Sequence, residues 1–177
     1  MVTTNDERLA GELRKLRDCG RVSRYVHDVF GFTARLNTVN AAIGLVQLRH
    51  LDDWNERRRE LAALYDRRLR GLEAVSPPPV PSGERKPVYH LYAIRCSDRD
   101  ALSEHMTARG VEVGVHYPVP IHLQPVYREV YGYSEGGFPV SEGLSRRLLS
   151  LPIFPSMTEG EVGYVCDIIW EFYGGRE

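Results

Sequence analysis

The segment HYPVPIHLQPVY, residues 116–127, gathers polar rings and an amide on a stiff piece of backbone. His116, Tyr117, His122 and Gln124 offer hydrogen-bond donors, acceptors and flat ring faces. Three prolines restrict the backbone here, which excludes a helix interior and predicts an ordered loop. Such a loop suits a binding surface, and the alternative is a rigid connector whose rings pack against the rest of the protein.

Metal binding is not expected at this loop or at the cysteines. The two histidines are separated by six residues through prolines and have no third ligand nearby. The three cysteines, Cys19, Cys96 and Cys166, are far apart and lack metal-ligand spacing, and their odd number does not fit a disulfide framework. We therefore predict no metal site and reduced, mostly buried thiols.

Lysine is nearly absent from the sequence. Of the 23 basic residues only Lys15 and Lys86 are lysines. Lys15 lies in the charged stripe of an expected helix, beside Arg14, and Lys86 lies in a hydrophilic stretch before Pro87. We predict a solvated surface role for both.

The composition indicates a globular chain with a core of its own. Its 177 residues, 42% hydrophobic and 27% charged, suit one domain or one domain with a fragment of another. A formal net charge of −1 disfavours binding to nucleic acid or to anionic membrane surfaces. No apolar run approaches the roughly 20 residues that span a bilayer, and MVTTNDERLAGEL is not a signal pattern. We expect a cytoplasmic protein.

Helical patterns dominate the first 70 residues, which look like one end of a larger domain. Residues 1–4 are β-prone and predict a short strand, and Asn5 or Asp6 can cap a helix that closes on Gly20. Residues 37–72 keep a helical apolar period, which predicts one connecting helix or two in tandem. An apolar stripe on the first helix predicts an oligomeric or poorly soluble chain. Its residues are Leu9, Leu13 and Leu16.

Residues 71–87 contain SPPPVPSGERKP and predict a linker or an edge segment. After it, strands are expected at VYHLYAIRC and VEVGVHY, helices at DRDALSEHMTARG and HLQPVYREV, and a helix then a strand at SEGLSRRLLSLPIFP. A last helix begins at a capping box of Thr158 and Glu161. Residues 88–177 therefore predict a small α/β or α+β domain, with helices against one face of a short sheet.

Four blocks, in this order, resemble one enzyme family: GFTARLNTVNAAIGLVQLRHLDDWNERRRELAALY, HLYAIRC, HYPVPIHLQPVY and LSLPIFPSMTEGEV. They are similar to the carboxy-terminal half of the DegT/DnrJ-type sugar aminotransferases, pyridoxal-phosphate enzymes of the aspartate-aminotransferase fold. The resemblance implies an α/β fold whose small α+β domain has a sheet covered by helices and follows a long connecting helix. It assigns residues 1–70 to a remnant of the large cofactor domain with the connecting helix, and residues 88–177 to the small carboxy-terminal domain.

The resemblance implies pyridoxal phosphate as the cofactor, bound only in a completed active site. In the family, the lysine that forms the Schiff base and the acidic residue at the pyridine nitrogen lie upstream, so no catalytic residue is assigned here. A G-[YF]-N-x-R block in the family reaches across a homodimer to the cofactor phosphate. Thr33, in place of the Asn, and Arg35 stand in that block and are our cofactor-binding candidates. The alternatives are Thr33 as a helix cap and Arg35 as a structural residue, while Asn40, in place of a Gln, suggests packing or capping.

In the family the proline loop lies near the mouth of the active site. The resemblance therefore implies that His116, Tyr117, His122 and Gln124 contact a nucleotide-sugar substrate. The alternatives are that Tyr117 only packs and that His122 starts the next helix.

Three functions stay open. The chain is the carboxy-terminal portion of an aminotransferase that passes an amino group from an amino acid to a keto-sugar nucleotide, active only with an amino-terminal complement and in a homodimer. Alternatively, it is a catalytically dead scaffold or regulatory partner of an intact homologue, or a small sugar-nucleotide binding domain.

Overall fold

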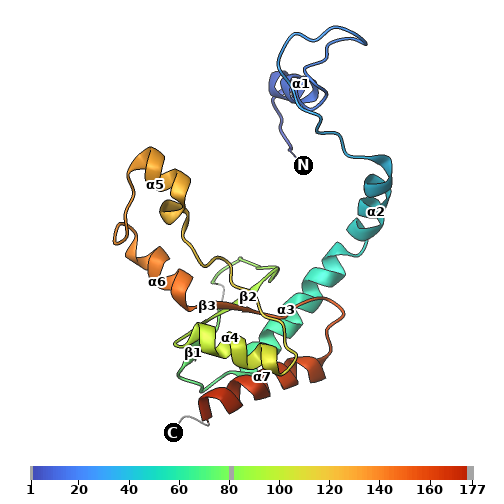
Figure 1. The fold of residues 1–177 in the computed structure, drawn as a ribbon. Helices are drawn as coiled ribbons and strands as arrows, with labels where there is room; N and C mark the ends of the chain where they lie inside the picture. Colours follow the sequence, from blue (N-terminus) through green and yellow to red (C-terminus); the bar gives the residue numbers. More distant parts are fainter. Residues whose placement is uncertain (1, 80–81, 175–177) are drawn as a thin grey trace. The chain divides into compact units, whose positions relative to one another are not determined.

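The computed structural model describes residues 2–79 and 82–174, and these divide into two compact units, Met1–Leu51 and Asp52–Glu177 (Figure 1). The division falls near the start of helix α3 (Leu51–Arg68), whose last turns are buried with the carboxy-terminal sheet. The sequence-based boundaries at residues 70 and 87 stay a prediction.

The first unit contains two helices with side-chain caps. Asp6 precedes α1 (Glu7–Leu16) and accepts a hydrogen bond from the Leu9 amide at 3.0 Å, as expected for an N-cap. Asn37 caps α2 (Thr38–Leu48) by accepting from the Asn40 amide at 2.8 Å. The expectation that Thr33 caps this helix is therefore wrong, because the cap lies four residues later.

The structure differs from one expectation about the start of the chain and decides between two alternatives for the long helical pattern. The strand expected at residues 1–4 is not present at residues 2–4, where no partner strand pairs with the backbone, and residue 1 lies outside the described residues. The long helical pattern is two helices in tandem, α2 and α3, interrupted at Arg49 and His50. Neither α1 nor α2 contains a buried residue, and Leu9 is exposed.

The second unit is built on a three-stranded antiparallel sheet in the order β1 (Val75–Ser76), β2 (Tyr92–Cys96), β3 (Leu148–Leu151). The strand expected at VEVGVHY is wrong, because only Gly114 makes an isolated bridge, with Ser150 of β3. Its amide donates to the Ser150 carbonyl at 3.0 Å and its carbonyl accepts from the Ser150 amide at 2.7 Å. The nearby prolines lack the N–H that would continue the ladder.

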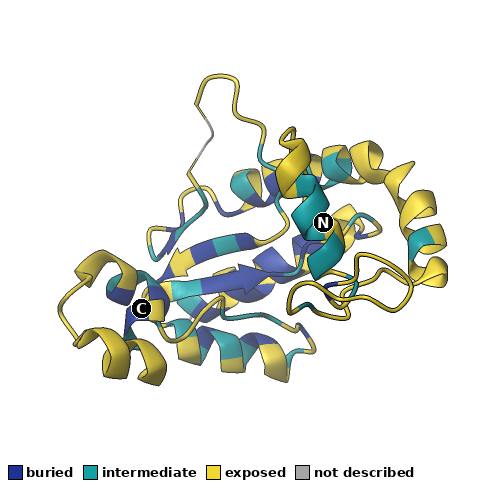
Figure 2. Cartoon of the chain, turned by 90° about the horizontal axis from the view of Figure 1, so that it is seen from above, coloured by how far each residue is buried: buried dark blue, intermediate teal, exposed yellow. Residues whose placement is uncertain are grey.

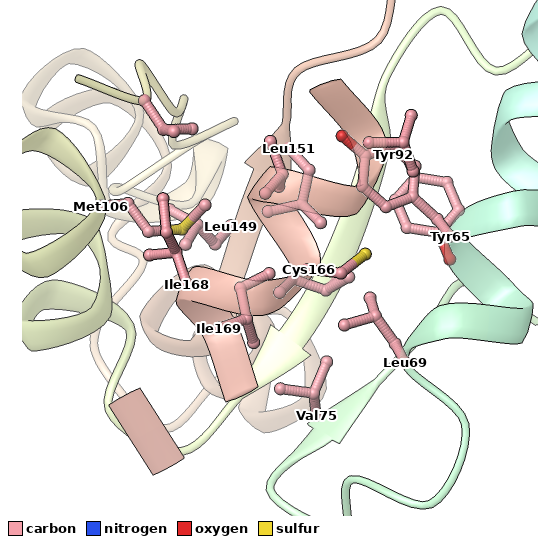
Figure 3. Close-up of a cluster of buried hydrophobic side chains, with 14 of the residues drawn as sticks. Tyr65, Leu69, Val75, Tyr92, Met106, Leu149, Leu151, Cys166, Ile168 and Ile169 are labelled. Atoms are coloured by element: carbon pink, nitrogen blue, oxygen red, sulfur yellow. The ribbon is translucent and has the colours of Figure 1, made fainter. Parts of the chain in front are cut away.

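Three helices cover one face of the sheet, as the sequence predicted: α3, α4 (Arg99–Ala108) and α7 (Glu159–Gly174). Thr158 and Glu161 form the expected capping box at the start of α7. Alternate residues of β2 are buried, and Figure 2 shows the buried positions gathered on the strands and the facing helix surfaces. Figure 3 shows the core packed between them. Its fully buried members include Tyr65, Leu69, Tyr92, Ile94, Met106, Leu149, Cys166 and Ile169.

A small lobe, residues 121–147, leads from the proline loop back to β3. It contains the short 3-10 helix η1 (Ile121–Leu123), α5 (Pro125–Tyr131) and α6 (Pro139–Arg147). Pro125 and Pro139 occupy first-turn positions, where the missing N–H costs nothing. Figure 1 shows α5 and α6 beyond the end of the sheet, with α6 running directly into β3.

Candidate functional site

His116 lies beside the outer strand of the sheet with one ring nitrogen engaged. Its Nδ1 is 3.0 Å from the hydroxyl oxygen of Ser150, a buried residue of β3. A side chain at Gly114 would displace the His116 ring, because a Cβ there would lie 2.5 Å from its Cε1. His116 as a residue is exposed, so a ligand can reach it.

Tyr117 stands next to this imidazole, edge to face, with 5.6 Å between ring centroids. It is 74% exposed, so the alternative that it packs into the interior does not describe this chain. His116 and Tyr117 together present an imidazole and a phenol on one surface. These groups can donate hydrogen bonds to hydroxyl or phosphoryl oxygens.

His122 has a different environment: it lies within η1 and is buried. Its Nε2 is 2.9 Å from Oε1 of Glu142 in α6, and its ring packs on Phe138 at 4.7 Å between centroids. Glu142 also accepts hydrogen bonds from the amides of Gly136 and Phe138. These amide donors hold the pKa of Glu142 below its usual value, with a smaller contribution from His122. The pair therefore holds η1 and α6 together.

Gln124 is exposed immediately before α5, and its side chain makes no capping hydrogen bond to that helix. The structure thus brings His116 and Tyr117 together, leaves Gln124 on the surface, and places His122 inside the lobe. Substrate contact by these four residues stays a prediction.

Thr33 and Arg35 lie in the first unit, on a segment that pairs with the end of α1. Thr33 forms a backbone bridge with Asp18, and its hydroxyl lies 3.4 Å from the sulfur of Cys19. The Nε atom of Arg35 is 3.5 Å from Oδ1 of Asp18, while the side chain stays 61% exposed. A hydroxyl and a guanidinium two residues apart can bind phosphate oxygens, so both fit the predicted cofactor phosphate contact.

Two glycines set the path of the loop that ends at Thr33. Gly20 has φ +73, and a Cβ at this position would lie 1.7 Å from the Val29 carbonyl oxygen. A Cβ at Gly31 would lie 2.0 Å from the Gly20 amide nitrogen. The two backbone stretches therefore cross at a distance that admits only glycine, which fixes the place of the Thr33 segment relative to α1.

Neither lysine fits the covalent attachment of pyridoxal phosphate. The Lys15 ammonium is 3.0 Å from Asp28 and 3.1 Å from Glu12. The hydrogen bond with Asp28, followed by that with Glu12, raises the pKa of Lys15, so the nucleophilic neutral amine is disfavoured. Lys86 is exposed between β1 and β2. The residues present fit phosphate recognition and do not supply the Schiff base.

Other features do not add to this site. Within residues 2–79 and 82–174, no group of three or more His, Cys, Asp or Glu side chains is arranged to hold a metal. In the same ranges, none of the helices combines the length and apolar character needed to cross a lipid bilayer. A hollow of about 460 Å³ on α3 contains none of the predicted site residues. It is lined by Arg57, Glu60, Leu61, Ala63, Leu64, Arg67 and Glu159.

Three residues that hold the candidate side chains in place were not predicted from the sequence. Ser150 contacts His116, Glu142 contacts His122, and Asp18 contacts Arg35. A serine inside the apolar stretch LLSLPIF is a weak signal, because a buried hydroxyl needs a partner. Glu142 and Asp18 have no comparable signal in the sequence.

The model of the DegT/DnrJ/EryC1/StrS aminotransferase family matches residues 1–170. The erythromycin biosynthesis sensory transduction protein EryC1 of Saccharopolyspora erythraea is 42% identical over 93% of this chain and 44% of its own length. The dTDP-3-amino-3,4,6-trideoxy-alpha-D-glucose transaminase of Streptomyces venezuelae is 40% identical over 97% of this chain and 45% of its own length.

The solved structure of DesV from S. venezuelae superposes with a TM-score of 0.89 at 40% identity, over 96% of this chain and 45% of that one. The chain spans about half the length of the curated relatives it matches. The matched part is the carboxy-terminal half of these relatives.

Proposed function

This chain belongs to the DegT/DnrJ/EryC1/StrS aminotransferase family, as its four sequence blocks predicted, and we propose that it forms the carboxy-terminal portion of a nucleotide-sugar aminotransferase. Aminotransferases of this family depend on pyridoxal phosphate, which when bound acts as the electron sink for moving an amino group. The observation that carries the proposal is that the chain matches about 45% of the length of its relatives. The poor fit of both lysines to the Schiff base supports it. Activity therefore requires an amino-terminal half, whether it precedes these residues or is supplied separately.

The chain contributes binding groups from both of its units. Thr33 and Arg35 hold the cofactor phosphate through a hydroxyl and a guanidinium, in a homodimer whose second subunit supplies the rest of the pocket. His116, Tyr117 and Gln124 form the outer wall of the substrate site, and His122 supports it through Glu142. The substrate is a keto-sugar linked to a nucleoside diphosphate, and an amino acid is the amino donor.

The exposed apolar side chains of the first unit support the need for a complement. Phe30, Phe32 and Leu36 before α2 are all at least 70% exposed. A protein surface that keeps such a patch open to water tends to associate. We infer that the amino-terminal half and a second subunit cover it, and we place the assembled enzyme in the cytoplasm.

A cofactor titration tests the proposal. The purified chain is mixed with pyridoxal phosphate, with and without the separately expressed amino-terminal half of the S. venezuelae relative, and trapped with borohydride. Peptide mapping should find the cofactor on a lysine of the amino-terminal half, and amino transfer should occur only in the mixture. Specific labelling of Lys15 or Lys86 together with transfer by the chain alone would overturn the proposal. Association without any transfer would favour the scaffold role.

A further inference from the structure

The imidazole of His116 contacts the hydroxyl of Ser150 and lies against Gly114, two residues that the family resemblance does not assign. We propose that Ser150 is a positioning residue for His116, which it holds in the tautomer that donates from Nε2 to an oxygen of the nucleotide sugar. This role deepens the proposed function and rests on it, because the ligand is the substrate inferred above.

Ser150 faces away from the main core. It lies between Leu149 and Leu151, which are both buried in the core, so strand alternation turns its side chain to the opposite face of the sheet. It is nevertheless only 5% exposed. A buried hydroxyl without a partner is costly, and in the described part of the chain the one recorded partner of its oxygen is Nδ1 of His116.

Gly114 lies against the Cε1 edge of the same ring, because a Cβ there would lie 2.5 Å from Cε1. Its paired backbone hydrogen bonds with Ser150 fix its position, and the absence of a side chain leaves room for the His116 ring. The imidazole therefore packs against the hydroxyl of Ser150 and the backbone of Gly114, which has no side chain. Nδ1 faces the Ser150 hydroxyl, and within the described residues no hydrogen bond engages Nε2, so Nε2 is the nitrogen that remains for a ligand.

The chemistry of the ligand selects the direction of the hydrogen bond. Phosphoryl oxygens of a nucleoside diphosphate only accept hydrogen bonds, so a neutral His116 can bind them only when Nε2 carries the proton. In that tautomer Nδ1 is an acceptor, and the Ser150 hydroxyl donates its single proton to it. The same arrangement gives the buried hydroxyl an acceptor. The hydroxyl proton that Ser150 donates to Nδ1 thus determines that Nε2 is the nitrogen that donates to the substrate.

Nitrogen NMR on the full 177-residue chain tests this assignment. The six histidines are labelled with ¹⁵N, His116 is identified from the signals lost in His116→Asn, and spectra are recorded at a pH where the ring is neutral. The wild type should show the Nε2–H tautomer, and Ser150→Ala should give a mixture of both. Ser150→Thr, which keeps the hydroxyl, should retain the wild-type tautomer. A dominant Nδ1–H form in the wild type, or unchanged signals in Ser150→Ala, would overturn the proposal.

Ser145→Ala is a matched control for the loss of a buried hydroxyl. Ser145 is 8% exposed and donates to the Glu142 carbonyl at 2.8 Å, so its removal should leave the His116 signals unchanged. Gly114→Ala is a second variant, at the residue that lies against the His116 ring. Its Cβ should displace the ring and change the His116 signals while the Ser150 hydroxyl remains. Unchanged His116 signals in Gly114→Ala would contradict the contact between Gly114 and the ring.

Kinetics of the assembled enzyme separates this role from the proposed function. Ser150→Ala should raise KM for the nucleotide sugar about twofold with little change in kcat, because an equal mixture of tautomers halves the population of His116 that can donate from Nε2. Ser150→Thr, which keeps the hydroxyl, should have a KM close to that of the wild type. An equal KM in Ser150→Ala and the wild type would contradict the role of Ser150. If the wild-type assembly transfers no amino group, the proposed function fails, and the nitrogen signals still decide whether Ser150 sets the tautomer.

Discussion

Helix α2 exposes apolar side chains that a complementing half should bury. All five of its large apolar residues are more than half exposed. Full burial of such a side chain contributes about 1.5–3 kcal/mol. Ile43 is 51% exposed, so covering the exposed part contributes about 1 kcal/mol, and Ile43→Ala should weaken association about fivefold. The five residues are Val39, Ile43, Leu45, Val46 and Leu48.

Analytical ultracentrifugation or calorimetry of the chain with the amino-terminal half of the S. venezuelae relative measures this effect as a ratio of Kd values. Ile43→Asp should weaken binding much more than Ile43→Ala, because it places a charge in a covered apolar surface. Val88→Ala removes an exposed apolar side chain from the other unit and serves as the control, with an unchanged Kd. If Ile43→Asp binds as tightly as the wild type, α2 is not covered in the complex and the reasoning is refuted.

Three further predictions concern a core residue, a buried carboxylate and the cysteines. Ile169→Ala, at a fully buried position, should lower the free energy of unfolding by about 3 kcal/mol in urea titrations followed by tryptophan fluorescence, since both tryptophans lie in the second unit. The pKa of Glu142 is lowered in the fold, so its contribution is present above about pH 4.5 and is lost as pH falls through the lower folded pKa; the difference in Tm between wild type and Glu142→Gln should shrink in that acid range. Iodoacetamide at neutral pH should modify exposed Cys19 first, because burial raises the pKa of Cys96 to about 11 and that of Cys166 to about 12. Mass spectrometry should find the two buried thiols labelled only after denaturation.

Local signals predicted the elements whose ends are set by their own residues. Helix α7 begins at the Thr158 and Glu161 capping box, and Asp6 caps α1, because these contacts involve residues three apart in the chain. The strand expected around Gly114 failed because a strand exists only if a distant partner continues the ladder. The strand expected at residues 1–4 is absent from residues 2–4 for the same reason. Two of the three cysteines are buried, as composition suggested, but residue type alone did not identify Cys19 as the exposed one.

The two histidines of the proline loop show why the candidate site needed the structure. Both belong to HYPVPIH, and their residue type alone does not predict different roles for them. His122 meets Glu142, 20 residues later, and is buried, whereas His116 meets Ser150, 34 residues later, and stays exposed. Glu142 and Ser150 are only eight residues apart, on either side of the junction where α6 becomes β3. One helix–strand junction therefore places one imidazole against a carboxylate, where it supports the lobe, and the other against a hydroxyl, where Nε2 is left for a ligand.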